Sequence, residues 1–484
     1  MINSLKEVIE KYDIVIGIEC HVQLATKTKL FSGADNDARD AAPNTKVNPV
    51  DFGFPGVLPV LNEQAVELAI RAGIALNADI PRLSRFERKH YFYPDLPFGY
   101  QITQLAEPVI VGGSVAIETE TGAKTIRLHH AHIESDAGKL THPAGQNYSL
   151  VDLNRAGTPL IEIVSEADMT SPQDAKAYAT ALYQLMTFAG VTHGDLYHGN
   201  MRFDVNLSLK PKGQTEFGTR TETKNLNSFR SIERAAEHEA VRQAQLLDRG
   251  ETITQETRGW NEDKQQTFSQ RSKEDAHDYR YFPDADLPPV IIEEADVRHV
   301  RETMPLLPAQ FRDDFAELKL QDSVTSRLLA SSSQAQFVYD LHRDQGGELA
   351  ARVAAWWTAL PRSDENDSLA VRSIPQKFYV ELFELSQSGQ ISSNSAEVIF
   401  KEMIQSSTTP KQIAEEKGLL QSNDAGEIER IVDEVLADPA SEKVLADIRS
   451  GNDKAIGYLV GQAMKKSQGK ANPAMLQQLI RQKI

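Results

Sequence analysis

The order of apolar and polar positions predicts two kinds of structure along the chain. Up to about residue 290, short runs rich in β-branched residues alternate with turns, as expected for strands and loops. Within this part, three stretches have apolar residues at helical spacing: 62–76, 171–189 and 228–248. Beyond about Pro288 the helical pattern dominates, and Gly and Pro turn signals divide it into short segments. We therefore expect an α+β domain, then a helical domain, then a small helical tail that begins near Thr408.

Several predicted strands have one apolar face and one face of chemically reactive groups, because successive strand residues point to opposite sides. In the first strand, Cys20 lies on the apolar face and Glu19 and His21 on the other, so Cys20 is a core residue rather than a nucleophile. The polar faces of the other segments carry His130, His132 and Glu134; Asp152 and Asn154; Arg202, Asp204 and Asn206; and Arg220, Glu222 and Lys224. An antiparallel sheet with one solvated face accounts for part of this pattern. Carboxylates and histidines on successive strands also suit a hard divalent ion.

Basic residues near these segments would complete a phosphoryl-transfer site. Mg²⁺ keeps several of its waters and is usually shared with the phosphates of a substrate. Lys89, Arg155 and Lys224 are candidates to contact phosphate oxygens beside such an ion. The chain has no G-x-x-x-x-G-K-[ST] motif, so a nucleotide site would not be of the P-loop type. Periodicity alone leaves open whether the polar faces converge.

Composition indicates a water-soluble globular protein of two to four domains. The chain has 484 residues, of which 40% are hydrophobic and 25% charged. A single cysteine excludes an internal disulfide and fits a reducing compartment. Acidic residues interrupt the N-terminal segment where a signal peptide would be apolar, and no apolar run is long enough to span a membrane. We therefore expect a cytoplasmic protein without membrane contact.

The distribution of charge singles out the C-terminal end. The net charge of −17 disfavours diffuse binding of nucleic acid over the whole surface. Residues 411–450 carry five Lys/Arg against ten Asp/Glu, whereas residues 451–484 carry six against one. The basic segment is either a solvated helical face or a local patch for RNA.

Two segments of the chain are similar to each other: YFYPDLP at 91–97 and YFPDADLP at 281–288. The similarity indicates two facing loops or arises by chance.

Long motifs in a fixed order make the chain resemble the B-subunit family of the tRNA-dependent aspartyl/glutamyl-tRNA amidotransferases. The resemblance covers nearly the whole chain, and several motifs are too long to agree by chance. They include IGIECHVQLATKTKLF (16–31), RKHYFYPDLPFGYQITQ (88–104), HIESDAGK (132–139), DLNRAGTPLIEIV (152–164), GNMRFDVNLSL (199–209), ETKNLNSF (222–229), DYRYFPDADLPP (278–289) and AIGYLVGQAMKKSQGKANP (455–473).

This resemblance implies an ATP-dependent ligase that works in a heterotrimer. A glutaminase A subunit would release ammonia from glutamine, and a small C subunit would brace A against B. The B subunit would use ATP and Mg²⁺ to phosphorylate the side-chain carboxylate of Asp on tRNA(Asn) or of Glu on tRNA(Gln), and ammonia would then displace phosphate. The sequence leaves open which tRNA is the substrate. The alternatives are a non-catalytic tRNA-binding scaffold of the same complex and an independent metal-dependent hydrolase.

The family's motif positions also imply roles for individual residues. Metal ligands are expected at Glu19, His21, Glu134, Asp204 and Glu222. Catalytic roles are expected for Glu19, His21 and Lys224, and contacts to nucleotide or substrate for Lys89, Arg155 and Asn227. The implied domains are an antiparallel-sheet, cradle-like catalytic domain at 1–295, a helical domain at 296–407 and a tRNA-binding helical tail at 408–484.

Two departures from the family pattern change these expectations. Many members have four zinc-binding cysteines where this chain has Ser32, Ala34, Asn48 and Asp51, so no zinc is expected. Many members also have a second Glu where this chain has Ser135. That substitution leaves open whether the segment around Glu134 binds the metal, because the Asp-Ala-Gly that follows is turn-like and makes strand parity unreliable there.

Overall fold

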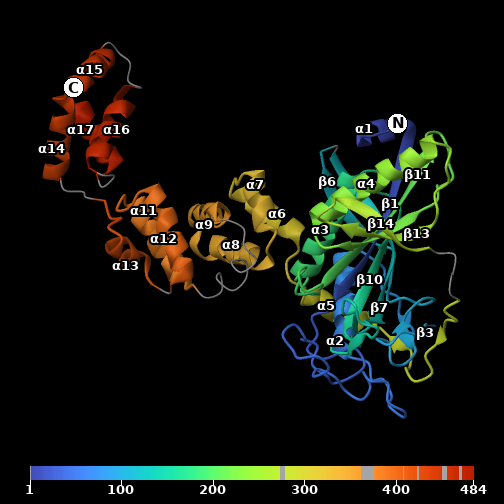
Figure 1. The fold of residues 1–484 in the computed structure, drawn as a ribbon. Coiled ribbons are helices and arrows are strands. Elements are labelled where there is room, and N and C mark those ends of the chain that lie inside the picture. Colours follow the sequence, from blue (N-terminus) through green and yellow to red (C-terminus); the bar gives the residue numbers. More distant parts are fainter. Residues whose placement is uncertain are drawn as a thin grey trace. The chain divides into compact units, whose positions relative to one another are not determined.

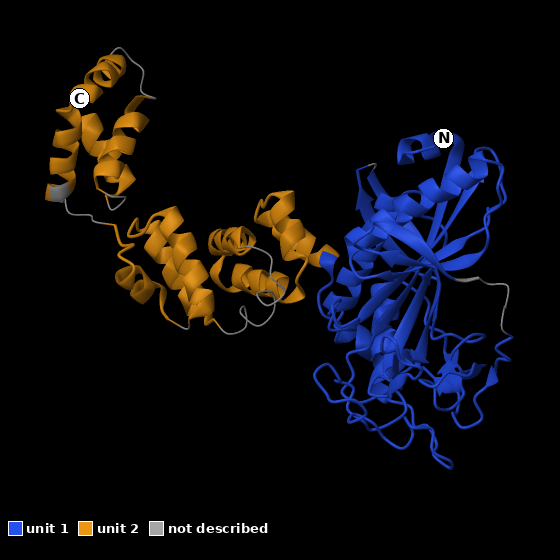
Figure 2. Cartoon of the chain, viewed as in Figure 1, with its two compact units in different colours: residues 1–308 blue, residues 309–484 orange. Residues whose placement is uncertain are grey.

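A computed structural model describes residues 2–120, 122–272, 278–360, 374–406, 408–421, 425–449, 455–467 and 471–484. The chain forms two compact units, residues 1–308 and residues 309–484 (Figure 2). The first unit contains all of the named strands, and the second is helical (Figure 1). The predicted α+β class is therefore confirmed.

A nine-stranded sheet organises the first unit. Its strands run in the order β14-β13-β12-β11-β1-β10-β7-β5, and β6 pairs with β7 off this path. All of these pairs are antiparallel except β12 with β13, which is parallel. The strands are β1 Tyr12–Gln23, β5 Ile110–Val111, β6 Ser114–Thr119, β7 Gly122–Ser135, β10 Pro159–Ser165, β11 Met201–Pro211, β12 Thr221–Leu226, β13 Glu256–Asn261 and β14 Gln266–Ser272. The long β1 therefore lies near the middle of the sheet.

Smaller sheets lie beside the large one. The first has the order β15-β3-β4, with β3 at Glu87–His90, β4 at Tyr100–Thr103 and β15 at Phe282–Pro283. Two further pairs join short strands: β2 (Leu83–Ser84) with β16 (Val290–Ile291), and β8 (Lys139–Thr141) with β9 (Leu150–Asp152). The pairs β15-β3 and β16-β2 join segments near residue 285 to segments near residue 85 within the same unit.

Helices cover the apolar face of the sheet. The three predicted helices form as α2 (Glu63–Ala75), α3 (Pro172–Phe188) and α4 (Phe229–Asp248). Ser228 caps α4 as predicted, because its hydroxyl accepts a hydrogen bond from the backbone of Ser231. Helix α3 packs on α4, and both contact strands of the sheet. Cys20 is fully buried in the core beneath them, which confirms its structural role. The unit also holds α1 (Leu5–Lys11) and α5 (Glu294–Glu302).

The second unit is built from short helices around two hydrophobic clusters. The first cluster extends from Leu341 to Ala414 and the second from Ile428 to Ile480. The helices are α6 Pro308–Glu317, α7 Asp322–Leu328, α8 Ser332–Gln345, α9 Gly347–Ala359, α11 Gln376–Gln387, α12 Ser393–Gln405, α13 Pro410–Glu416, α14 Ala425–Leu436, η1 Pro439–Ser441, α15 Glu442–Arg449, α16 Ile456–Lys466 and α17 Pro473–Lys483. Helix α13 packs on α11 and α12, and so belongs to the first cluster. The three-part division of the chain stays a prediction.

Among the described residues, no helix has both the length and the apolar character needed to cross a membrane.

Candidate active site

The register of the central strands places the predicted polar groups side by side. Glu19 on β1 lies opposite Asp204 on β11, and His21 lies opposite Glu162 on β10. Glu162 in turn lies opposite His132 on β7. Directly opposed residues point to the same side of a sheet, so these groups share the face that α3 and α4 leave uncovered. Four neighbouring strands therefore contribute to one polar surface.

Two of these residues, His21 and Glu162, form what we call the histidine cluster together with Glu134 on β7. The Nε2 atom of His21 lies 3.6 Å from Glu134 Oε1 and 3.6 Å from Glu162 Oε2. His132 contacts both carboxylates as well. Its Nε2 atom lies 3.3 Å from Glu162 Oε2 and 3.7 Å from Glu134 Oε2. The three members offer ligand atoms within 4.8 Å of one another, which is close enough to hold one ion.

Next to it is the acidic cluster: Glu19, Asp204 and Glu222. Their carboxylate oxygens also lie within 4.8 Å of one another. The Nζ atom of Lys224 is 2.7 Å from Asp204 Oδ2 and 3.1 Å from Glu222 Oε1, so an ammonium already supplies positive charge here. The amide of Asn206 donates a hydrogen bond of 3.0 Å to Glu19, which fixes that carboxylate. The acidic cluster is thus partly neutralised by the chain itself.

Burial and mutual repulsion set the electrostatics of the acidic cluster. Burial, and then the negative charges of Glu162, Glu222 and Asp204, raise the pKa of Glu19 above its ordinary value. Burial alone would lower the pKa of Lys224, but Asp204 and Glu222 raise it above its ordinary value. Lys224 is therefore a permanent cation at neutral pH, and additional positive charge near Glu19 would relieve the remaining repulsion.

In the histidine cluster, positive charges and hydrogen bonds compensate the buried negative charge of Glu162. Burial would raise the pKa of Glu162, but its hydrogen bond with His132 and the charges of His21, His132 and Lys89 hold that pKa well below its usual range. Burial would lower the pKa of His132, but hydrogen bonds with Glu134 and Glu162 raise it to about 9. A protonated His132 therefore keeps Glu162 ionised. One imidazole and two carboxylates are a donor set that suits a hard divalent cation such as Mg²⁺ or Mn²⁺.

The five predicted metal ligands are therefore divided between two neighbouring clusters. His21 and Glu134 belong to the histidine cluster, while Glu19, Asp204 and Glu222 belong to the acidic cluster, together with the predicted catalytic Lys224. Whether any of them binds a metal stays a prediction.

The three predicted contact residues lie in different surroundings. Lys89 lies close enough to Glu162 for its charge to lower the pKa of that carboxylate. The guanidinium of Arg155 instead donates hydrogen bonds to the carbonyl oxygens of Ala137 and Gly138, so it braces the loop that follows β7. Asn227 is exposed between β12 and the capping residue Ser228. Their roles in binding nucleotide or substrate stay predictions.

Sequence reasoning missed Glu162 as a member of the histidine cluster. It lies on β10 within the apolar run PLIEIV, and a lone carboxylate in the middle of a buried strand was the available signal. Strand alternation places His132 on the polar face but does not indicate its role. Its function as a partner of two carboxylates depends on β10 lying between β1 and β7, and that order cannot be read from local periodicity.

Strand β7 continues through Ser135, so the alternation of faces holds at this position. The Ser135 hydroxyl donates a hydrogen bond to the carbonyl of Ile102 on β4, away from the histidine cluster. Glu134 faces His21 instead. Ser135 therefore contacts the small sheet, and the neighbouring Glu134 supplies the carboxylate at the cluster.

A buried ion pair holds the loop with Ser32, Ala34, Asn48 and Asp51, where the family resemblance implies zinc-binding cysteines. The Nζ atom of Lys29 lies 3.1 Å from Asp51 Oδ2, and the side chains are 0% and 3% exposed. The same carboxylate accepts hydrogen bonds from the hydroxyl of Ser32 and from the backbone amide of Asn48. Three of the four cysteine positions thus meet at one carboxylate. Ala34 is the fourth, and its backbone amide donates to the Ser32 hydroxyl.

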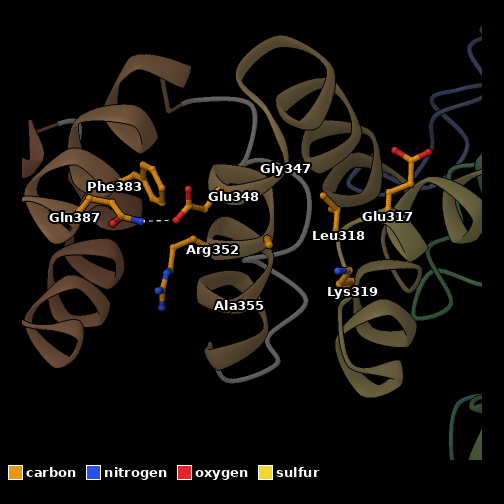
Figure 3. A pocket seen from close by; sticks show the side chains of 10 residues that line it. Glu317, Leu318, Lys319, Gly347, Glu348, Arg352, Ala355, Phe383 and Gln387 are labelled. Atoms are coloured by element: carbon orange, nitrogen blue, oxygen red, sulfur yellow. Dashed lines mark hydrogen bonds between the residues drawn. The ribbon is translucent and has the colours of Figure 1, made fainter.

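The helical unit contains a separate pocket of about 660 Å³. Residues at the end of α6 and on α9 and α11 line it, among them Lys319, Glu348, Arg352 and Gln387. Glu348 accepts a hydrogen bond of 2.9 Å from Gln387 across the pocket (Figure 3). Its lining mixes acidic and basic groups, and no cluster of potential metal ligands lies among the described residues there. The sheet face is therefore the stronger candidate for chemistry.

Comparison with known families covers most of the chain. A family model described as the GatB/GatE catalytic domain matches residues 14–298, which include both clusters. A second model, described as the GatB domain, matches residues 344–484. The two models thus match the strand-rich unit and most of the helical unit.

Curated relatives align over nearly the full length. Proteins named as the B subunit of aspartyl/glutamyl-tRNA(Asn/Gln) amidotransferase are 46% identical in Alcanivorax borkumensis and 46% in Polynucleobacter asymbioticus, over 98% of this chain in each case and 99% and 100% of the relatives. The relative of the same name from a Geobacter species is 44% identical over 98% of this chain and 99% of its own. The chain therefore belongs to the family of aspartyl/glutamyl-tRNA(Asn/Gln) amidotransferase B subunits.

Proposed function

We propose that this chain activates the side-chain carboxylate of Asp or Glu on a misacylated tRNA with ATP, and then directs ammonia to the activated group. The products would be Asn-tRNA(Asn) or Gln-tRNA(Gln), ADP and phosphate. The observation that carries this proposal is the pairing of the two clusters on one sheet face, with Lys224 and Lys89 beside them. A surface with carboxylates for a divalent ion and ammonium groups for phosphates suits phosphoryl transfer.

The chemistry proceeds in two displacements. An oxygen of the substrate carboxylate attacks the γ-phosphorus of ATP, the bond to the β-γ bridging oxygen breaks, and ADP leaves. Ammonia then attacks the carbonyl carbon of the acyl phosphate, loses a proton, and inorganic phosphate leaves. A carboxylate is a poor acyl donor, so its conversion to an acyl phosphate makes the second step accessible.

Residues of the site have distinct tasks in these displacements. Lys89 and Lys224 place positive charge next to the phosphates and stabilise the negative charge that develops there. His132 keeps Glu162 ionised and orients the carboxylates of Glu134 and Glu162. A Mg²⁺ ion held by His21, Glu134 and Glu162 would neutralise the transferring phosphoryl group. Glu19, whose pKa is raised, belongs to the acidic cluster and lies near Glu162 of the histidine cluster, and it is a candidate to accept a proton from the attacking ammonia.

The proposed assembly is a heterotrimer in the cytoplasm, with a glutaminase A subunit as the source of ammonia and a small C subunit. The basic helices near the C-terminus would contact tRNA. Some of their charge is already balanced within the tail, because Lys466 pairs with Glu434, and Lys483 pairs with Glu429 and Asp433. Lys454 and Lys470 lie outside the described residues. Lys465, in the last turn of α16, is a candidate for phosphate contacts.

Variants of the two clusters test the proposal in the assembled complex. His21→Ala, Glu162→Gln and Glu19→Ala should each lower ATP-dependent amide formation by about 100-fold or more, because each removes a group that acts on developing charge. Glu162→Gln should also raise the Mg²⁺ concentration needed for half-maximal activity. Binding of misacylated tRNA should stay unchanged. Glu118→Gln, an exposed carboxylate on β6, is the matched control and should leave all three measurements unchanged.

The same assay separates the alternatives. A non-catalytic scaffold would keep full activity in all three cluster variants. A stand-alone metal-dependent hydrolase would turn over substrate without partner subunits or tRNA. Assaying amide formation on Asp-tRNA(Asn) and Glu-tRNA(Gln) in parallel, with and without ATP, identifies which tRNA this chain serves.

A further inference from the structure

The two similar tyrosine-rich segments lie side by side. Strand β15 pairs with β3, so that Phe282 lies opposite Arg88, and the backbone amide of His90 donates a hydrogen bond of 2.8 Å to the carbonyl of Tyr279. Arg88 holds the second segment in place, because its guanidinium forms ion pairs of 2.7 Å with Asp284 and 2.8 Å with Asp286. The second segment therefore pairs with the strand that leads into the first, so the two segments lie close together.

Four tyrosines from these segments form what we call the tyrosine cluster: Tyr91, Tyr93, Tyr279 and Tyr281. Tyr91 packs edge-on against Tyr93 and Tyr279, with ring centroids 6.0 and 6.2 Å apart, and Tyr279 packs edge-on against Tyr281 at 6.2 Å. The residue Tyr93 is 50% exposed, and the other three are partly exposed. The Nζ atom of Lys89 lies 5.0 Å from the ring centroid of Tyr279 and 6.0 Å from that of Tyr91. An ammonium therefore borders an accessible group of aromatic rings.

Hydrogen bonds place this cluster at the edge of the histidine cluster. Lys89 lies opposite Gln101 on β4, and the Gln101 amide donates a hydrogen bond of 2.9 Å to the carbonyl of Ser135, the residue after Glu134. The backbone amide of Gly138 donates to the carbonyl of Asp95 in the loop that follows the first tyrosines. The small sheet is thus fastened to the end of β7 where Glu134 lies.

The raised pKa values of two of these tyrosines agree with a position near the histidine cluster. Burial, followed by the negative charge of Glu134, raises the pKa of Tyr91 above its ordinary value. Burial and the neighbouring Tyr279, Glu134 and Glu162 raise the pKa of Tyr281 to about 12. Both phenol groups therefore lie within electrostatic reach of the carboxylates, and the Lys89 ammonium is near both the rings and Glu162.

We propose that the tyrosine cluster stacks the adenine base of ATP, and that Lys89 contacts the phosphate chain between this base and the histidine cluster. Aromatic side chains bind nucleobases through their ring faces, and a lysine beside them attracts phosphate. The order of rings, ammonium and carboxylates matches the order of base, phosphates and bound metal in ATP. The terminal adenosine of a tRNA fits this order less well, because its phosphate and its amino acid lie on opposite sides of the ribose. This inference rests on the proposed use of ATP.

Binding of AMP-PNP with Mg²⁺ to the assembled complex, measured by isothermal titration calorimetry, tests the assignment. Tyr279→Ala should weaken binding about tenfold, the size expected for loss of one stacking contact, and Tyr279→Phe should bind within about twofold of the unchanged protein. Tyr197→Ala is the control, because Tyr197 is 91% exposed and its ring packs edge-on against His198. It should leave binding unchanged.

Two further measurements identify the bound group. Tripolyphosphate has no base, so Tyr279→Ala should leave its affinity unchanged. The KM for misacylated tRNA should also be unchanged. Equal loss for AMP-PNP and tripolyphosphate would indicate general distortion and overturn the proposal. Unchanged AMP-PNP affinity would overturn it too, as would a rise in the KM for tRNA alone, which would assign the rings to tRNA. If the unchanged complex fails to bind AMP-PNP, the proposed function itself is wrong.

Discussion

The side chain of His132 contacts two carboxylates of the histidine cluster, Glu134 and Glu162. Its imidazole lies between Glu134 and Glu162, and its Nδ1 atom is 3.1 Å from Nε2 of His130. Water reaches the residue poorly, since His132 is only 8% exposed. An imidazolium in this position compensates two buried carboxylates that would otherwise repel each other.

The raised pKa of His132 predicts a pH dependence of stability. In the unfolded chain the pKa is about 6.5, and in the folded protein it is about 9. The folded state therefore binds this proton more tightly, so the stabilisation is fully present below about pH 6.5 and is lost as pH rises through about 9. Urea titrations of the unchanged protein and of His132→Gln measure how much free energy of unfolding the substitution removes. This loss should be largest near pH 6.5 and should decline as the pH approaches about 9. A loss that does not vary with pH would contradict the assignment.

Individual strands were predictable where one face packs into the core and the other carries polar groups. The alternation in β1 placed Cys20 in the core and Glu19 and His21 on the opposite face, and the structure agrees. The sequence alone also predicted that Ser228 caps the N-terminus of α4. The division of the ligands into two clusters could not be predicted in this way, because it depends on β11 and β10 flanking β1 on opposite sides. Local periodicity contains no information on that order.

The loop between β1 and α2 gives a prediction at the scale of an element. Lys29 and Asp51 are buried, so removing one partner leaves an uncompensated charge in the core. Lys29→Met and Asp51→Leu should each lower the free energy of unfolding of this unit by about 3–5 kcal/mol. The double variant should lose less than either single variant, because it leaves no unpaired charge.

Chemical denaturation of the four proteins measures this coupling. Lys11→Met is the control, because the ion pair of Lys11 with Asp248 lies at the surface and its loss should change stability little. Additive losses in the double variant would mean that Lys29 and Asp51 do not stabilise the loop as a pair.

At the scale of the whole chain, the helical unit contains two separate cores. Helix α13 packs with α11 and α12 in the first, whereas α14, α16 and α17 pack together in the second. A truncation intended to remove the tail should therefore begin after α13. Cutting at residue 408 would also take away Ile413 and Ala414, which are buried in the first core.

Deletion of residues 422–484 should weaken tRNA binding and flatten its dependence on salt. Each lysine or arginine that contacts phosphate releases counterions, so the slope of log affinity against log salt falls with the number of contacts. Several basic residues of the tail are already paired within it, so the expected change in slope is small, about one to two contacts. Lys465→Gln should reproduce part of the change without truncation. Filter-binding titrations over a range of salt concentrations measure both quantities. An unchanged slope in the truncated protein would assign the basic segment to a solvated surface and move the tRNA contacts elsewhere on the chain.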